Sequence, residues 1–370
     1  TFSEGKAMKI FRNLIAFWSI LALAVMGCIG SSTTPTAATP TTDGAHLLVE
    51  VKGQVTLKRA AWTKDQATSF GTMLRRGDQI KVESGGQAKV LCDNLLLASV
   101  PEGAPTGLNN LCPQSAESVL KESNSAIINT RGAPNTNLPY IVSPRATKIR
   151  ATQPTLRWND TSAKEYTVQV IAADGTVTWQ TKTNQTRIVY GGGELQNGIN
   201  YFLKVTADGA SSTNENVTGI GFALLSTDDG KQVDAAEAKV KALSLTPESR
   251  EFALAHIYVH YGLFAEAIEK LESLSQSNSS PQVWLMLGDI HWQVGLPLLA
   301  QTYYQKALTA SDIEGSAKAQ TMLGEIYDKT FNNRDEALRY FKMAKESYIM
   351  LGDTKQMQDI EKRIAEIEKR

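Results

Sequence analysis

The chain has 370 residues, with 38 Lys and Arg balanced by 38 Asp and Glu and with only four His. This length allows two or three domains, and the 42% hydrophobic content is ordinary for a globular protein. The even charge balance gives no support for nucleic-acid binding. Beyond the N-terminal region, no apolar run is long enough to span a bilayer.

The N-terminal region predicts an export signal. A short basic start precedes the almost wholly apolar stretch 14–26, which has the length of a secretory core and is short for a spanning helix. Gly27 and Cys28 follow, and this order resembles the lipobox of bacterial lipoproteins. The resemblance implies that residues 1–28 form a signal and lipobox region and that the thiol of Cys28 accepts the lipid. The alternative is an uncleaved N-terminal anchor.

Residues 29–44 are rich in Ser, Thr and Pro and have no apolar period, so they predict a flexible or semi-extended linker. A lipid anchor followed by such a linker holds a soluble body at a membrane, outside the cytoplasm. Ile29 follows the cysteine, where resemblance to the enterobacterial sorting rule would require Asp for retention at the inner membrane. In a cell with two membranes we therefore expect the outer one, with the protein facing the periplasm or the surface.

Cys92 and Cys112 remain once Cys28 is assigned to the lipid. In an exported chain an even remainder predicts a disulfide, which here closes a loop of about twenty residues and contributes roughly 3 kcal/mol. The alternative is a pair of free buried thiols. The spacing does not match a zinc pattern, which needs four close ligands.

Residues 45–131 predict a small β-roll or barrel-like sheet, because short alternating runs are separated by glycine turns. Val51-x-Gly53-x-Val55, then Arg76-Gly77-Asp78-x-Ile80, then Ala88-x-Val90 resemble the FecR-type extracytoplasmic domain. Classical members take part in transmembrane signalling to a sigma factor. Their cytoplasmic anti-sigma segment has no counterpart here, so we do not expect that role. We interpret Gly77-Asp78 as a tight turn.

Residues 137–226 predict a β-sandwich. Alternating runs surround a hairpin signal at Ala173-Asp174-Gly175. Pro154-x-Leu156-x-Trp158, then Tyr166-x-Val168-x-Val170, then Leu195-x-x-Gly198-x-x-Tyr201 resemble a fibronectin type III-like domain, which implies a fold and almost nothing about function. Trp179 allows stacking on a sugar ring, although a strand tryptophan is more often packed.

The apolar period becomes helical in residues 234–370, where an internal repeat appears. Leu254-Ala255, Leu287-Gly288 and Leu323-Gly324 align, and Ala267, Ala300 and Ala337 begin the second helices. This pattern resembles the tetratricopeptide repeat. Small residues let paired helices approach closely, and the polar stretch 354–370 predicts a capping helix. The fold class is thus multidomain α and β: a small FecR-like β domain, a β-sandwich and an all-α tetratricopeptide solenoid.

By this resemblance the first helix of each pair lines a concave groove that binds a protein or peptide. The residues predicted to line it are Phe252, His256, His260, Asp289, Trp292, Gln293, Glu325 and Asp328. For Trp292 the alternative is packing on a neighbouring helix. His256 and His260 have a spacing that suits metal binding, but no third ligand is evident, so we predict no metal site.

The sequence contains no nucleophile elbow, no P-loop and no dinucleotide fingerprint. We therefore predict a non-catalytic protein without cofactors. The first hypothesis is an extracytoplasmic lipoprotein that serves as a scaffold or sensor and binds an envelope protein or peptide through the helical stack. The second is binding of an envelope glycan, polysaccharide or peptidoglycan, by the β domains. A hydrolase would require an acidic pair in the β domains.

Overall fold

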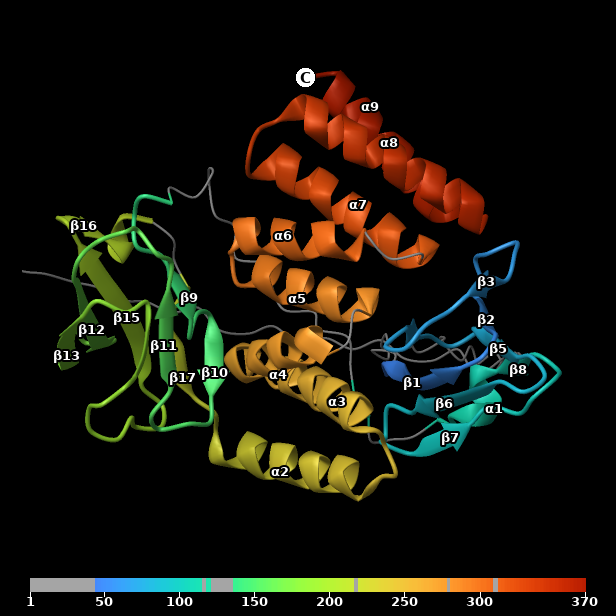
Figure 1. Ribbon diagram of the computed structural model, residues 1–370, viewed down its shortest axis with the longest axis horizontal. Coiled ribbons are helices and arrows are strands. Elements are labelled where there is room, and N and C mark those ends of the chain that lie inside the picture. The colour runs from blue at the N-terminus through green and yellow to red at the C-terminus, as the bar shows by residue number, and fades with distance from the viewer. Residues whose placement is uncertain (1–43, 115–117, 121–135, 216–218, 278–279, 309–311) are drawn as a thin grey trace, which may run out of the picture. The chain divides into compact units, whose positions relative to one another are not determined.

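A computed structural model describes residues 44–114, 118–120, 136–215, 219–277, 280–308 and 312–370. The predicted lipidation site Cys28 and the linker up to residue 43 lie outside the described residues. Among those described, no helix has both the length and the apolar character that crossing a membrane requires. The chain is a multidomain protein of mixed α and β structure, with β sheets first and helical repeats after them, as predicted (Figure 1).

The first β body, residues 44–120, contains two four-stranded sheets with the orders β4-β1-β6-β7 and β3-β2-β5-β8. A short helix, α1 (Leu108–Leu111), follows the last strand. The strands are β1 (His46–Lys52), β2 (Val55–Lys58), β3 (Gln66–Ala67), β4 (Met73–Leu74), β5 (Gln79–Val82), β6 (Gln87–Leu91), β7 (Leu97–Ser99) and β8 (Thr106–Gly107).

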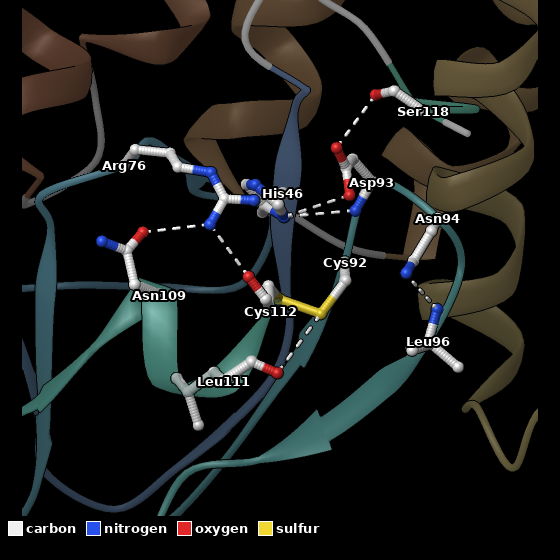
Figure 2. The surroundings of a disulfide bond; sticks show 10 residues. All are labelled: His46, Arg76, Cys92, Asp93, Asn94, Leu96, Asn109, Leu111, Cys112 and Ser118. Atoms are coloured by element: carbon white, nitrogen blue, oxygen red, sulfur yellow. Dashed lines mark hydrogen bonds and ion pairs between the residues drawn. A yellow bond between two sulfur atoms is a disulfide. The ribbon is translucent and has the colours of Figure 1, made fainter. Parts of the chain in front are cut away.

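Strand β1 is buried on both faces. Leu47 and Val49 belong to one hydrophobic core and Leu48 to another. The predicted disulfide is present and joins Cys92, after β6, to Cys112, after α1, with 5.5 Å between their Cα atoms (Figure 2). It fixes α1 against the sheet that contains β1.

The second β body, residues 136–225, has a larger sheet with the order β10-β17-β15-β12-β13, in which β16 pairs with β15, and a smaller sheet with the order β14-β11-β9. Its core contains Trp158, whose ring meets Tyr166 at 5.7 Å. The strands are β9 (Ile141–Ser143), β10 (Thr147–Ile149), β11 (Thr155–Trp158), β12 (Tyr166–Ala172), β13 (Val177–Thr183), β14 (Arg187–Val189), β15 (Asn200–Ala207), β16 (Ala210–Ser211) and β17 (Phe222–Leu224).

The helical region packs each helix on its neighbours in chain order (Figure 1). Three pairs, α3/α4, α5/α6 and α7/α8, lie between α2 and the terminal helix α9, which covers the stretch predicted as a cap. The helices are α2 (Thr227–Ala242), α3 (Pro247–His260), α4 (Phe264–Ser277), α5 (Pro281–Gln293), α6 (Pro297–Ala307), α7 (Ile313–Lys329), α8 (Arg334–Leu351) and α9 (Thr354–Glu368).

Local sequence explains where these helices begin and turn. Proline occupies the first turn of α3, α5 and α6, where its missing N–H costs nothing. Gly262 and Gly295 adopt φ of 74° and 75° in the turns of the first two pairs, a conformation that glycine adopts readily. The third turn uses Asn332 at φ 50° instead.

The close contact within each pair depends on a small residue facing a large one. A Cβ added to Gly288 would lie 2.7 Å from the Tyr304 ring, and one added to Gly324 would lie 2.8 Å from the Phe341 ring. Neither site has room for a methyl group, because backbone and ring already touch. Large residues of the second helices therefore fill the space that small residues of the first helices leave.

Candidate functional site

The first helices of all three repeats, the end of α8, the start of α9 and the first β body together line one cavity of about 290 Å³. Its helical wall has an apolar part from α3 and α5 and a polar part from α5 and α7. Its opposite wall is the segment that contains the edge strand β4. The residues that the argument below uses are Phe252, His256, Gln282, Met286, Asp289, Lys318, Arg59, Gly71, Met73 and Arg75.

The first β body is seated on the helices at this cavity. The Phe70 ring meets Phe252 of α3 at 5.3 Å, and the Ser280 hydroxyl donates to the Phe70 carbonyl at 2.8 Å. A Cβ on Gly71 would lie 2.8 Å from the Gln282 Cβ. The backbone of the 70–71 segment thus touches α5 directly, and only glycine fits there.

A largely buried arginine joins the same two parts of the chain. Arg59 donates from Nε and Nη2 to the two carboxylate oxygens of Glu314 on α7, at 2.5 and 2.9 Å, and from Nη1 to Asp78 at 2.7 Å. Burial raises the pKa of Glu314 and of Asp78, and the Arg59 charge opposes both shifts. Burial tends to lower the pKa of Arg59, but the two carboxylates outweigh it and the net shift is upward.

The Gly77-Asp78 turn therefore does more than reverse the chain. The Asp78 amide donates to Arg75 O at 3.1 Å, which makes the predicted tight turn. Its carboxylate is 3% exposed and also accepts from the Arg75 amide at 2.9 Å. The turn thus presents a buried carboxylate that orients Arg59 toward α7.

The polar wall carries a cation with capacity for a ligand. Lys318 Nζ donates to Asp289 at 2.6 Å, and Asp289 also accepts from the Tyr304 hydroxyl at 2.7 Å. The Lys318 side chain is 50% exposed, and its partial desolvation opposes the charge, yet Asp289 outweighs this effect and raises the lysine pKa, so the ammonium stays charged. An ammonium has three donors, and a single acceptor is recorded for this one among the described residues.

His256 contributes a neutral ring to the wall. Burial, with a smaller contribution from the Lys318 charge, lowers its pKa to about 3. Its ring meets Phe252 edge-on at 4.8 Å. A neutral imidazole between an aromatic ring and an ammonium can donate or accept one hydrogen bond but does not add a positive charge to the cavity.

Three of the eight predicted groove residues, Phe252, His256 and Asp289, line this cavity. Trp292 lies elsewhere, 8% exposed in the core cluster that also contains Tyr304 and Leu323. This is the packing alternative considered for Trp292, and it arises because the ring points between helices.

The other four predicted groove residues also lie outside the cavity. Glu325 and Asp328 bind Arg363 of α9, so the capping helix covers them. His260 packs on Tyr261 with ring centroids 4.8 Å apart. Gln293 lines a separate hollow that β10, β17 and the start of α4 border.

The second β body contacts the helices at a different place. Arg145 donates to the carbonyls of Val294 and Gly295, and the Lys148 amide donates to Gly262 O at 2.8 Å. Trp179, considered as a sugar platform, packs edge-on against Tyr190 at 5.2 Å. The second β body therefore contacts the turns between paired helices, whereas the first β body lines the cavity.

Sequence reasoning missed Arg59, Glu314 and Lys318, which are central to the cavity. Arg59 and Glu314 are 255 positions apart, and the sequence around each residue does not predict that they pair. Lys318 has a weak signal, because it follows Asp289 by 29 positions on the next first helix. A search for opposite charges on successive first helices would have found it.

Comparison with known families supports the repeat assignment. Residues 281–312, which span α5 and α6, match the tetratricopeptide repeat family model. The crystal structure of MamA covers 38% of this chain and 90% of its own, at 20% identity and a TM-score of 0.28. The crystal structure of YrrB, described as a TPR protein with an unusual peptide-binding site, covers 38% and 80%, at 18% identity and a TM-score of 0.24. Among curated protein sequences no match is found. The helix pair α5/α6 thus matches a tetratricopeptide repeat, and it lies in a stack with two further helix pairs among the described residues.

Proposed function

We propose that this chain is a non-catalytic, membrane-anchored lipoprotein outside the cytoplasm, and that its repeat region binds a protein or peptide in the cavity between the repeats and the first β body. Tetratricopeptide repeats are protein-binding modules, and the family match supports that general class. The cavity is the single observation that gives this class a location in the chain.

The chemistry of the cavity suits an extended peptide. Met286 and Phe252 offer an apolar floor, and Lys318 and Arg75 provide cations at its rim. Met73 belongs to β4, an edge strand that pairs only with β1 among the described strands. Edge strands present backbone groups to an incoming chain, although the Met73 carbonyl here already accepts from Arg59 at 3.0 Å. A volume of about 290 Å³ lies near the lower limit for a drug-sized ligand, so the cavity holds one or two side chains of a longer partner.

The roles of the two β bodies are part of this proposal. The FecR-like resemblance of the first body and the fibronectin type III-like resemblance of the second support envelope modules that position the repeats. The first body contributes a wall of the binding cavity, and the second stabilises the turns of the repeat stack. The predicted lipid on Cys28 would hold the whole assembly at a membrane.

Photo-crosslinking in native envelopes tests the proposal. A photoreactive amino acid at Met286, in the cavity, is expected to trap a discrete protein partner, and one at Lys342, exposed on α8, is expected not to. Adding Lys318→Ala is expected to reduce the Met286 crosslink. Equal crosslinking from both positions, or capture of polysaccharide in place of protein, would contradict the proposal, and the polysaccharide outcome would favour the glycan hypothesis.

A further inference from the structure

The second β body has a hollow of its own, apart from the cavity described above. Its volume is about 260 Å³, and it lies between the turn that joins β12 to β13 and the loop that follows β14. All of the side chains that line it belong to this body, and none of them lines the cavity. The lining residues that the argument below uses are Asp174, Tyr190, Glu194, Leu195, Ile199 and Tyr201.

Tyr190 lines this hollow and carries a hydroxyl group that has no partner in the described chain. The residue is 2% exposed, and Trp179 packs edge-on against its ring. Its amide donates to Pro154 O at 2.9 Å, whereas its hydroxyl makes no hydrogen bond within the part of the chain that the structure describes. A hydroxyl that is taken out of water without a partner costs free energy. A ligand in the hollow would remove that cost.

A run of three glycines places this hydroxyl against the loop that borders the hollow. A Cβ added to Gly192 would overlap the Tyr190 hydroxyl and would lie 2.9 Å from the Trp179 Cβ. Only glycine lets the backbone approach a side chain so closely. The next two residues of the same loop, Gly193 and Glu194, line the hollow. The hydroxyl therefore lies beside the segment that supplies one of the two acidic side chains.

A second tyrosine hydroxyl and two apolar side chains complete the lining. Tyr201 is 4% exposed, and its hydroxyl accepts from the Gln196 amide at 2.8 Å. The hydroxyl proton of Tyr201 is thus available to a further acceptor. Leu195 and Ile199 give the hollow an apolar side. The hollow therefore combines hydrogen-bonding groups with a surface that suits a hydrocarbon chain.

The charge of the hollow is negative. Among the described residues that line it, only Asp174 and Glu194 carry a charge, and neither has an ion-pair partner within the described chain. The Thr176 amide donates to Asp174 Oδ1 at 2.9 Å. This bond, together with one from the Thr176 hydroxyl, lowers the pKa of Asp174, so the carboxylate is ionised at neutral pH. A hollow lined by charges of one sign favours a ligand of the opposite charge.

We propose that this hollow binds a lysine side chain of a protein partner. An ammonium group has three hydrogen-bond donors, and the carboxylates of Asp174 and Glu194 and the hydroxyl oxygen of Tyr190 offer acceptors around one hollow. The hydrocarbon stem of the lysine packs on Leu195 and Ile199, as such stems do on apolar surfaces. This binding role adds to the contacts of the second β body with the helical turns, and it does not depend on the cavity.

Saturation-transfer NMR with the full chain tests the proposal, with Nα-acetyl-lysine methylamide as the probe. We expect saturation to reach the methylene protons beside the ammonium group. The matched control probe carries an acetyl group on the side-chain nitrogen, which keeps the stem and removes the charge, and it should bind at least about tenfold more weakly. Equal binding of the two probes would overturn the proposal. Binding of the neutral disaccharide cellobiose in place of the lysine probe would also overturn it and would indicate a glycan site.

Two variants assign the binding to this hollow. Tyr190→Phe and Glu194→Gln are each expected to weaken binding of the lysine probe about tenfold. The matched controls are Tyr166→Phe, which alters a buried tyrosine of the same body whose hydroxyl is hydrogen-bonded, and Glu165→Gln, which alters an exposed carboxylate that is already paired. Both controls should bind the probe like the parent chain. If Tyr190→Phe and Glu194→Gln bind as tightly as their controls, the assignment is wrong.

The Tm of Tyr190→Phe separates loss of binding from loss of folding. The hydroxyl makes no hydrogen bond in the described chain, so its removal should leave the Tm of the protein without ligand at or above that of the parent chain. Weakened probe binding at an unchanged Tm is the result that the proposal predicts.

Discussion

The two β bodies hold the helical stack in different ways. The first shares hydrophobic cores with it: Leu47 and Phe252 lie in one cluster and Trp62 and Phe341 in another. The second is joined to it by polar contacts, such as Arg145 on the turn carbonyls and Arg157 on Glu272, and by a few partly buried apolar side chains, such as Val142 and Ala146, at the edge of the helical core. The first body therefore forms a wall of the cavity, whereas the second contacts the stack at its turns.

The two interfaces also differ in the free energy that is lost when one of their contacts is removed. Burial of apolar area stabilises the folded state roughly in proportion to the area removed from water. Separating the first body from the helices would therefore expose a hydrophobic core to water. A partly exposed ion pair contributes far less. The comparison predicts large effects from substitutions at the first interface and small ones from matched substitutions at the second.

The largest effect is expected from Phe252→Ala. The side chain is 1% exposed and packs on Phe70 across the first interface, so its loss leaves a cavity and lowers the free energy of unfolding by about 3–5 kcal/mol. Urea denaturation followed by circular dichroism measures the change. A loss below about 1 kcal/mol would mean that the first body does not share a core with the repeats.

A matched pair of arginines compares the two interfaces next. Arg59→Met leaves the carboxylates of Glu314 and of the nearly fully buried Asp78 without their guanidinium partner. We expect it to lower the free energy of unfolding by about 3–4 kcal/mol. Arg157→Met removes a bidentate pair with Glu272, in which both side chains are about a quarter exposed, and we expect it to cost about 1 kcal/mol or less. Chemical denaturation measures the free energy of unfolding of both variants. Equal losses would contradict the proposed difference between the two interfaces.

Reduction of the disulfide is expected to cost about 3 kcal/mol, because the bond closes a loop between residues 20 positions apart. Leu91, next to Cys92, belongs to the core that α3 and α4 share. We therefore expect reduction to loosen these helices as well as the first body. Hydrogen exchange resolved by peptide measures this, and protection unchanged in α3 would limit the effect to the first body.

Acidification acts through two buried histidines, one near each interface. Burial lowers the pKa of His256 to about 3 and of His291 to about 4, below the usual value near 6.5. Such a group stabilises the fold fully above pH 6.5 and progressively less as pH falls toward its folded pKa. From pH 6.5 to 4.5 each histidine should cost roughly 2–3 kcal/mol. In His256→Gln the loss of unfolding free energy between pH 6.5 and 4.5 should be smaller by the amount that His256 contributes. His291→Gln should reduce the loss in the same way. An unaltered pH dependence in these variants would contradict the view that the two histidines are neutral in the fold.

The repeat pattern was sufficient to predict the helices, because the small residues at Gly288 and Gly324 meet rings that the same pattern supplies. The pair Cys92 and Cys112 was likewise predictable from the expectation of export and from the cysteine number. The docking of the β bodies was not predictable, since it depends on contacts such as Arg59 with Glu314 between segments with no common local pattern. For the same reason the repeat pattern that assigned Glu325 to the groove could not predict its ion pair with Arg363 of α9.

A double-mutant cycle between Arg59 and Glu314 tests most directly that the first β body is a wall of the repeat cavity. The free energies of unfolding of the parent chain, Arg59→Met, Glu314→Gln and the double variant are measured by urea denaturation. Because the two side chains meet through two hydrogen bonds, a docked first body predicts a coupling energy of about 1–3 kcal/mol. Additive losses would show that the two parts fold without this contact and would contradict the account.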